Sequence, residues 1–424
     1  MDSSAHLGDL ADFIAASPSS YHAAAEAARR LTAAGFRRLD ETQPWPDAAG
    51  PARRFVVRDG AIVAWIQPAS AGPATGFRIL GAHTDSPGFK LKPKPTIASH
   101  GWLQAGVEVY GGPLLNSWLD RELELAGRLV SRDGTEHLVR TGALLRIPQL
   151  AVHLDRTVND ALTLDRQRHL TPVFGVDAAA TDLLDHLAAL AGLDAAEVAG
   201  YDLLTAATQA PAVFGLDGAF FAAGRLDNLS SVHAGLQALL SAPDDTDQIS
   251  VLAAFDHEEL GSASRSGASG PLLADILSRI GAGLGATVSE RGQAFAASWC
   301  LSADAGHAVH PNYPERHDPV NTPTIDGGPL LKINANQRYA TDAHGAALWA
   351  RCCEQAGVRY QHFVSNNDVP CGSTIGPLTA TRLGIRTLDV GIPLLSMHSA
   401  RELCHADAPA ALSNAIGAFF GPQE

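Results

Sequence analysis

The beginning of the chain alternates between helical and strand-like spacings of apolar residues. Five apolar side chains recur at helical spacing, namely Leu7, Leu10, Ala11, Phe13 and Ile14. Residues 21–34 are a second helix candidate. Two apolar runs within residues 53–67 flank Asp59-Gly60, which is a strong signal for a β-hairpin. The pattern predicts two helices, a hairpin and then a short buried strand over residues 76–82.

The middle of the chain has a different pattern. After several prolines, residues 94–218 show short strand-like runs with turn signals, such as residues 107–110 and 127–130. One helix candidate, residues 179–191, interrupts these runs. The pattern predicts an inserted, β-rich domain over residues 94–218.

From residue 219 onward, strand and helix patterns alternate again. Helix patterns cover residues 229–240 and 340–356, and strand patterns cover residues 249–255, 296–302 and 385–390. Strands that alternate with helices predict a largely parallel sheet flanked by helices. The expected fold is therefore α/β, with a mixed, largely parallel sheet in one domain (residues 1–93 plus 219–424) and the β-rich domain inserted into it.

The composition agrees with two folded domains, and the net charge argues against some classes of binding partner. The chain has 424 residues, and 46% of them are hydrophobic, which is more than one core usually needs. A net charge of −14 argues against nucleic acid and anionic membranes as partners. The chain has no signal-peptide pattern at its start and no uninterrupted apolar run long enough to span a membrane. Five cysteines without a C-x-x-C pair suggest no disulfide framework, so a reducing cytoplasm is expected.

Chemically active side chains follow the predicted strands. Ligands bind at the carboxyl ends of strands in open α/β sheets, and zinc takes histidine nitrogen and carboxylate oxygen. The candidates after the strands, or at the start of the helix over residues 229–240, are His83, Asp85, Asp227, Glu258, Glu259, Asp304, His307 and His398. Their joint placement predicts a metal site.

The spacing within two pairs suggests how such a site works. His83 and Asp85 are two residues apart, so on an extended strand both point to one side, and the carboxylate can accept the second imidazole N–H. Glu258 and Glu259 are adjacent and point apart in extended backbone, so that one can bind metal and the other can act as a base. Taken singly, these residues also fit a polar turn or a solvated loop, and Asp227 alone fits a helix cap.

Two local alternatives compete with this site. His398, Glu402 and His405 could share one face of a helix and form a separate metal-binding trio. Cys371 could be a nucleophile, although a structural role suits it better. No G-x-S-x-G elbow and no H-E-x-x-H helix are present.

Taken together, these residues resemble the aspartyl aminopeptidase family of dinuclear zinc peptidases. The similarity spans nearly the whole chain, without a departure at the motif positions. The main matching segments are Ala82-His83-Thr84-Asp85-Ser86-Pro87, Leu226-Asp227-Asn228, Asp256-His257-Glu258-Glu259-Leu260-Gly261-Ser262, Ser302-Ala303-Asp304 and Met397-His398-Ser399-Ala400-Arg401-Glu402. Others are Ala151-Val152-His153-Leu154, the segment His307-Ala308-Val309-His310-Pro311-Asn312-Tyr313 and Lys332-Ile333-Asn334.

The resemblance implies roles for individual residues. Asp227 would bridge two divalent metal ions, with His83 and Asp304 completing one site and Glu259 and His398 the other. The ions would be zinc, with manganese or cobalt as alternatives at one site. Glu258 would be the general base and Asp85 the partner of His83. His153, from the inserted domain, would reach a neighbouring subunit's active site and stabilise the substrate or the oxyanion there. Glu258, His307 and Lys332 would also contact substrate.

The expected activity is release of N-terminal acidic residues, Asp or Glu, from peptides by a metal-bridged water. The resemblance also implies a homo-oligomer, in which dimers formed through the inserted domain assemble into a tetrahedral dodecamer. Two alternatives are a related dinuclear metal amidohydrolase or deacylase, and a non-catalytic scaffold of the same fold. The presence of Glu258 beside a full ligand set speaks against the scaffold.

Overall fold

The computed structural model describes residues 3–45, 50–176 and 182–422. Within these ranges, nine strands form a mixed sheet in the order β1-β2-β3-β14-β4-β15-β19-β17-β18. Strands β14, β4, β15 and β19 at its centre are parallel, whereas β3 and β17 pair antiparallel with their neighbours β14 and β19. The bounds are β1 Arg37–Arg38, β2 Ala52–Arg58, β3 Ala61–Gln67, β4 Phe77–His83, β14 Ile249–Phe255, β15 Trp299–Ala303, β17 Leu330–Ile333, β18 Gln361–Val364 and β19 Arg386–Gly391. The predicted α/β class with a largely parallel sheet is confirmed.

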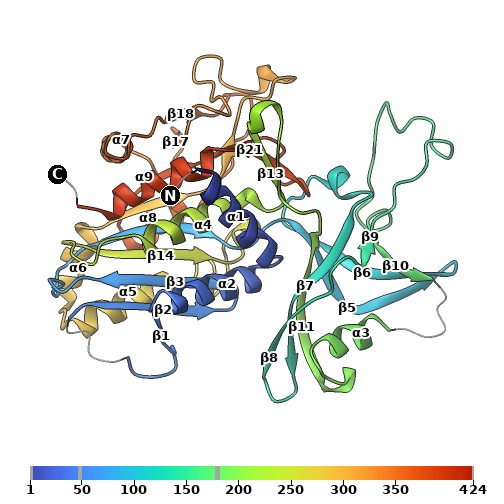
Figure 1. The fold of residues 1–424 in the computed structure, drawn as a ribbon, viewed down its shortest axis with the longest axis horizontal. Helices are drawn as coiled ribbons and strands as arrows, with labels where there is room; N and C mark the ends of the chain where they lie inside the picture. Colours follow the sequence, from blue (N-terminus) through green and yellow to red (C-terminus); the bar gives the residue numbers. More distant parts are fainter. Residues whose placement is uncertain (1–2, 46–49, 177–181, 423–424) are drawn as a thin grey trace.

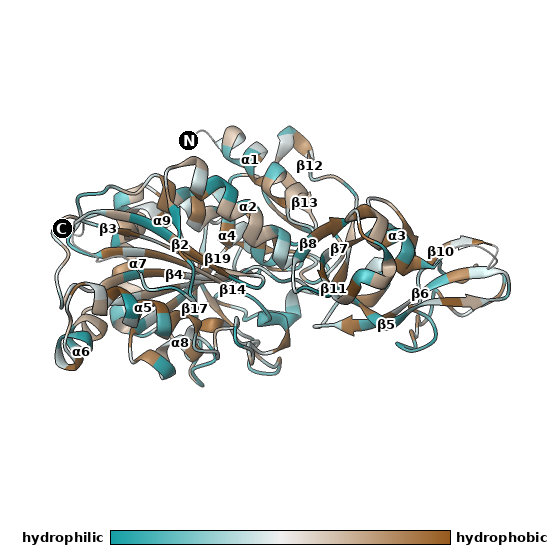
Figure 2. Cartoon of the chain, turned by 90° about the horizontal axis from the view of Figure 1, so that it is seen from below, coloured by the Kyte–Doolittle hydropathy of each residue, from teal (hydrophilic) through white to brown (hydrophobic). Residues whose placement is uncertain are grey.

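Helices cover both faces of this sheet (Figure 2). On one face lie α1 (Ser3–Ala16), α2 (Ser20–Ala33), α4 (Leu226–Leu240), α7 (Ala343–Ala356) and α9 (Ala408–Phe420). On the other face lie α5 (Leu272–Gly283), α6 (Val288–Ala296) and α8 (Ile375–Leu383). Ile62 and Ala64 of β3 pack into the first layer, and Val63 and Trp65 into the second. Since successive strand residues point to opposite faces, both sets must be apolar, which explains the continuous apolar runs of the central strands.

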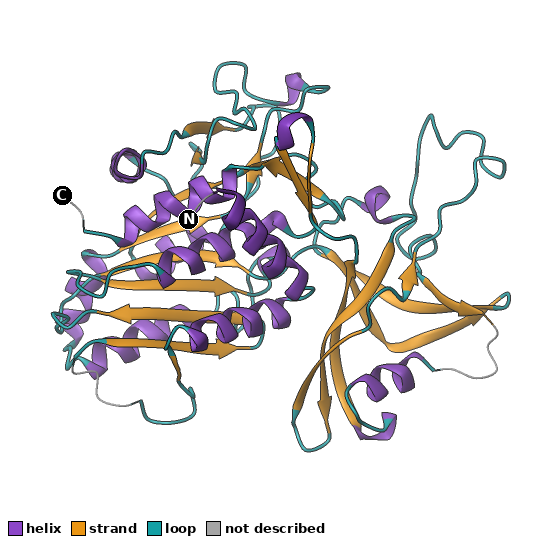
Figure 3. Cartoon of the chain, viewed as in Figure 1, coloured by secondary structure: helices purple, strands orange, loops and turns teal. Residues whose placement is uncertain are grey.

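A second sheet lies beside the first (Figures 1 and 3). Among the described residues it has seven antiparallel strands in the order β11-β5-β6-β10-β9-β7-β8, and β11 also pairs with β7. Its strands are β5 Gly88–Ser99, β6 Trp102–Tyr110, β7 Glu122–Ser131, β8 Glu136–Arg140, β9 Leu145–Arg146, β10 Val173–Val176 and β11 Val198–Ala207. Together with α3 (Leu183–Leu190), it encloses a hydrophobic core of its own. The domain boundaries at residues 94 and 218 stay a prediction; β5, from Gly88, already belongs to the second sheet.

Polar and aromatic contacts join the two sheets. Arg128 of β7 pairs with Asp59 in the turn between β2 and β3 at 3.0 Å, and its guanidinium lies 4.5 Å from the ring centroid of Tyr21 in α2. A small sheet of β12 (Ala212–Phe214), β13 (Phe220–Ala223) and β21 (Glu402–His405) lies nearby, and β16 (Gly306–His307) pairs with β20 (Pro393–Leu394).

Most predicted elements are present, with differences at their ends. The hairpin over residues 53–67 is confirmed by β2 and β3. The strand predicted from residue 296 is wrong at its start, because a capping box between Thr287 and Glu290 begins a helix that continues to Ala296. The helix predicted over residues 179–191 is present as α3, while residues 179–181 lie outside the described residues.

No single helix in the described part of the chain is long and apolar enough to cross a membrane. Among the described residues, one pair of helices, α5 and α6, reaches that length and composition when taken together, and the two helices meet at a bend of 120°.

Candidate metal centre

Three neighbouring parallel strands end at the same edge of the first sheet. β4 ends at His83, β14 ends at Phe255 shortly before Glu258, and β15 ends at Ala303 immediately before Asp304. Asp227 lies at the start of α4, which packs against β4 and β14. Because the carboxyl ends of parallel strands meet at one edge, side chains that are far apart in the sequence come together there.

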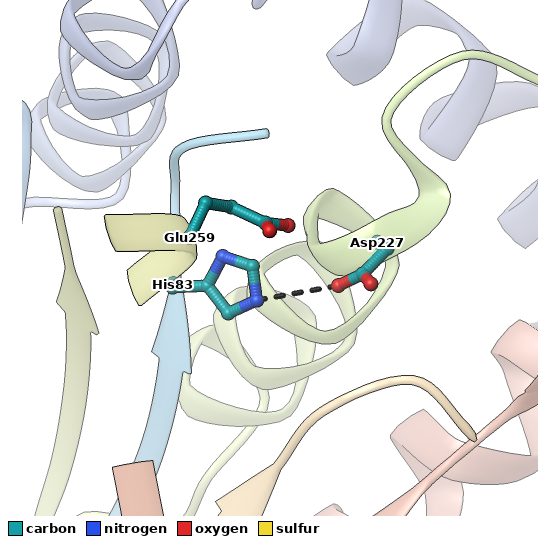
Figure 4. A group of neighbouring side chains, drawn as sticks. All are labelled: His83, Asp227 and Glu259. Atoms are coloured by element: carbon teal, nitrogen blue, oxygen red, sulfur yellow. Dashed lines mark ion pairs between the residues drawn. The ribbon is translucent and has the colours of Figure 1, made fainter. Parts of the chain in front are cut away.

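The five predicted metal ligands gather around the carboxylate of Asp227. His83 Nε2 lies 3.2 Å from Asp227 Oδ1 and 3.6 Å from Asp304 Oδ1. His398 Nε2 lies 3.5 Å from Asp227 Oδ2 and 3.4 Å from Glu259 Oε2. Figure 4 shows His83, Asp227 and Glu259 pointing toward one another, and each offers a ligand atom within 4.8 Å of the other two. Each oxygen of Asp227 therefore faces one imidazole, which leaves Asp304 beside His83 and Glu259 beside His398.

In both His83 and His398, the second ring nitrogen, Nδ1, is hydrogen-bonded to a backbone carbonyl oxygen. His83 Nδ1 lies 3.0 Å from the backbone oxygen of Asp85, and His398 Nδ1 lies 2.9 Å from that of Gly112. A carbonyl oxygen can only accept a hydrogen bond, so Nδ1 carries the proton in each ring. The Nε2 atoms are thereby directed at the carboxylates, as is usual for metal-binding histidines.

The charges at this edge are poorly balanced without a cation. Burial, together with the charge of Asp227, raises the pKa of Glu259 well above its usual range. Although burial opposes the shift, Asp227 and Glu259 raise the pKa of His398 to about 10. Glu259 Oε1 is buried, and no described residue donates a hydrogen bond to it. Crowded carboxylates with an unpaired buried oxygen, next to two oriented imidazoles, suit divalent cations such as zinc.

Asp85 holds the backbone of Glu258 and Glu259. Its Oδ1 accepts the N–H of Glu258 at 3.0 Å, and its Oδ2 accepts the N–H of Glu259 at 3.2 Å. The predicted contact with His83 is made, but mainly through the Asp85 backbone oxygen, since Oδ1 is 3.5 Å from His83 Nδ1. Strand β4 ends at His83, and Asp85 lies two residues beyond that end.

The side chains of Glu258 and Glu259 point in different directions, as expected, but they do so from a turn and not from extended backbone. The prediction of extended backbone is wrong, because Glu258–Leu260 form a 3-10 turn with positive φ at His257 and Gly261 on either side. Glu259 faces Asp227 and His398, whereas Glu258 lines the neighbouring cavity. Burial, with the charges of Asp304 and Asp227, raises the pKa of Glu258 to about 7. A carboxylate with this pKa can take and return a proton near neutral pH.

Glu402 supports two of the predicted ligands through their backbone. Its Oε1 accepts the N–H of His398 at 2.7 Å, and its Oε2 accepts the N–H of Asp227 at 3.0 Å. The alternative helical trio with His405 is wrong, because Glu402–His405 form strand β21 and His398 lies in a turn with φ of 65°. Sequence reasoning noticed Glu402 but assigned it to a helix that does not form.

A cavity of about 580 Å³ opens beside the ligand cluster. His307, Lys332 and Cys371 line it together with Glu258. Lys332 is almost fully buried; its Nζ donates to the backbone oxygen of Ala305 at 2.7 Å and lies 3.6 Å from Asp304 Oδ2. The structure thus places both predicted substrate contacts of the first domain at this cavity.

His153 lies elsewhere in the chain. It is exposed, in the connection between β9 and β10, which extends away from the first sheet in Figure 1. It is not among the residues that line the cavity in the described part of this chain. Its predicted role in a neighbouring subunit's site stays a prediction.

The fold and the ligand cluster define a metal-dependent hydrolase of the α/β zinc-peptidase class. Residues 13–420 match the model of a family described as Aminopeptidase I zinc metalloprotease (M18). The chain belongs to this M18 family, the aspartyl aminopeptidase type, and is a zinc metallo-aminopeptidase.

Related proteins share nearly the full length of the chain. A probable M18 family aminopeptidase 2 from Streptomyces avermitilis is 55% identical over 421 residues, covering 98% of this chain and 97% of the relative. A chain from the cryo-EM structure of the Ape4 and Nbr1 complex has a TM-score of 0.95 at 36% identity, covering 99% of this chain and 86% of that chain. A chain from the structure of the S. cerevisiae mApe1 dodecamer has a TM-score of 0.86 at 28% identity, covering 98% of this chain and 96% of that chain.

Proposed function

We propose that this aminopeptidase releases N-terminal Asp or Glu residues from peptides and holds two divalent metal ions per subunit. His83, Asp227 and Asp304 would hold one ion, and Asp227, Glu259 and His398 the other. The observation that carries the proposal is the Asp227 carboxylate, whose two oxygens face His83 Nε2 at 3.2 Å and His398 Nε2 at 3.5 Å. Zinc is the proposed metal, with manganese or cobalt as alternatives at one site.

Bound divalent cations lower the pKa of water and polarise a carbonyl. The Glu258 carboxylate takes the proton of the attacking water and later delivers it to the leaving amine. Its raised pKa of about 7 and its place on the cavity wall support this role. Asp85 keeps Glu258 in position through the backbone N–H. Glu258 and the other carboxylates of the cluster also attract the free α-amine of the peptide, which favours cleavage after the first residue.

The proposed preference for acidic residues rests on Lys332. Lys332 Nζ is a buried cation on the cavity wall of a protein with a net charge of −14. Its nearest carboxylate, Asp304, would share its charge with a bound metal ion, which leaves the ammonium available to a substrate carboxylate.

The proposed function can be tested by measuring kcat/KM for a panel of substrates, on enzyme whose metal content per subunit has been determined. We expect two metal ions per subunit and the highest kcat/KM for Asp- and Glu-anilides, above Leu- and Lys-anilides. The matched control is N-acetyl-Asp-anilide, which lacks the free amine and should not be cleaved. Preferred cleavage of N-acyl substrates would instead support a deacylase, and equal rates on Leu- and Asp-anilides would reject the acidic preference.

We also propose that the second domain, residues 94–218, is a dimerisation module within a dodecamer. Its connection between β9 and β10 exposes four large apolar side chains, Leu150, Val152, Leu154 and Leu162. Exposed apolar clusters of this kind are typical of protein interfaces. The related mApe1 structure is a dodecamer. The five cysteines are all free, and we propose the cytoplasm as the location.

The proposed assembly predicts a catalytic effect for an exposed histidine. His153→Phe should lower kcat by roughly 10²–10³-fold, because the ring would lose its contact with the developing negative charge in a neighbouring subunit. Metal content, measured by mass spectrometry, should stay at the wild-type level. The control His169→Phe, in the same exposed connection, should leave kcat unchanged. Loss of metal in His153→Phe would instead make His153 a ligand.

A further inference from the structure

One strand of the second sheet ends directly at the ligand cluster. β6 ends at Tyr110, whose hydroxyl donates to Asp85 Oδ2 at 2.9 Å. Gly111 follows with φ of +68°, and a Cβ at this position would lie 3.1 Å from Cβ of Glu259. The next residue, Gly112, accepts the hydrogen bond from His398 Nδ1. The domain that supplies none of the five proposed ligands therefore touches three residues of the site.

The hydroxyl of Tyr110 completes the hydrogen bonding of the Asp85 carboxylate. Asp85 is 3% exposed and accepts two backbone N–H groups, from Glu258 and Glu259, besides this phenol. A buried carboxylate needs such donors, and hydrogen bonds to an ionised acceptor are stronger than neutral ones. Tyrosine ordinarily keeps its proton below about pH 10, and burial beside Asp85 raises the pKa of Tyr110 further, so the phenol stays a donor.

We propose that Tyr110 is a positioning residue for peptide hydrolysis. Its hydroxyl orients the Asp85 carboxylate, and that carboxylate holds the turn that carries Glu258 and Glu259. The inference rests on the roles proposed above for these two glutamates. It follows that the precise placement of the base depends on the docking of the second sheet against the first.

The variant Tyr110→Phe tests the proposal because it keeps the ring and removes only the hydroxyl. We expect kcat on Asp-anilide to fall about tenfold, as for loss of one buried, charge-assisted hydrogen bond. KM and metal content should stay close to the wild-type values, since neither Lys332 nor the ligand atoms are changed. The matched control is Tyr201→Phe in the same sheet, which loses a hydroxyl that donates to the backbone oxygen of Lys92 at 2.7 Å. This control should keep wild-type kcat.

A double-mutant cycle separates positioning through Asp85 from a general effect on stability. In an Asp85→Asn background, the Tyr110→Phe change should cost much less than it does in the wild type, because the two groups act as one unit. Wild-type kcat in Tyr110→Phe, an equal loss in Tyr201→Phe, loss of metal, or a full additional loss in the Asp85→Asn background would each overturn the proposal.

The outcome for Glu258→Gln distinguishes this proposal from the proposed function. If Glu258→Gln is inactive and Tyr110→Phe is unimpaired, the positioning role fails alone. If Glu258→Gln turns over at the wild-type rate, the proposed mechanism itself fails.

Discussion

Replacing Glu258 with glutamine is expected to lower kcat by roughly 10²–10⁴-fold, the usual contribution of a general base. Glutamine has nearly the same shape as glutamate, so the 3-10 turn and its hydrogen bond to Asp85 should persist. It cannot take a proton from water, however, and the step that requires the carboxylate is lost. The metal content per subunit, counted by mass spectrometry, and the Tm should match the wild type.

Glu259→Gln is the matched control for this experiment. Glu259 is the next residue in the same turn, but its carboxylate faces His398 and Asp227 rather than the cavity. We expect this variant to lose metal as well as activity. Near-wild-type turnover in Glu258→Gln, or full metal content in Glu259→Gln, would contradict the division of roles between the two glutamates.

Asp227→Asn should abolish activity by removing both metal ions. The Asp227 carboxylate lies between the two imidazoles, and no other described carboxylate faces both of them within ion-pair distance. Loss of metal catalysis removes several kcal/mol of transition-state stabilisation, which corresponds to a drop in kcat of roughly 10³-fold or more. Metal counting and kcat on Asp-anilide would measure the two effects.

The metal-free form of this variant distinguishes loss of metal from loss of fold. A neutral amide relieves the repulsion between Asp227 and Glu259, but it also removes the attraction of the Asp227 carboxylate for His83 and His398. Because these two effects oppose each other, we expect the metal-free variant to stay folded and to unfold cooperatively, as the metal-free wild type does. The control Asp245→Asn, an exposed carboxylate, should change neither metal content nor activity. Two tightly bound ions per subunit in Asp227→Asn would exclude the bridging role.

The amino-acid sequence predicts the layered fold well because the evidence for it is local. The central strands β3 and β14 are buried along their whole length, and all but one residue of each strand are apolar, as buried positions favour. Turn and capping residues, such as Asp59-Gly60, place the hairpin. The boundary between α6 and β15 is predicted less well, because the helix signal before residue 296 and the strand signal after it compete over the same residues.

The candidate ligands could also be predicted from sequence. In a parallel sheet the carboxyl ends of strands meet, so His83, Glu259 and Asp304 could be expected at one edge. Singly, each also fits a turn or a loop. Their roles came from the resemblance to the aspartyl aminopeptidase family, and the structure adds the distances that group them around Asp227.

Local patterns along the chain define the helices and strands and the residue types at their ends. The partner of each functional group, in contrast, depends on how these elements pack in three dimensions. Asp85 supports the turn of Glu258, Glu402 supports Asp227 and His398, and Tyr110 reaches Asp85 from the second sheet. These contacts join segments far apart in the chain, and they depend on how layers and domains dock. Local periodicity carries no information about docking, so no pattern within one segment could have predicted them.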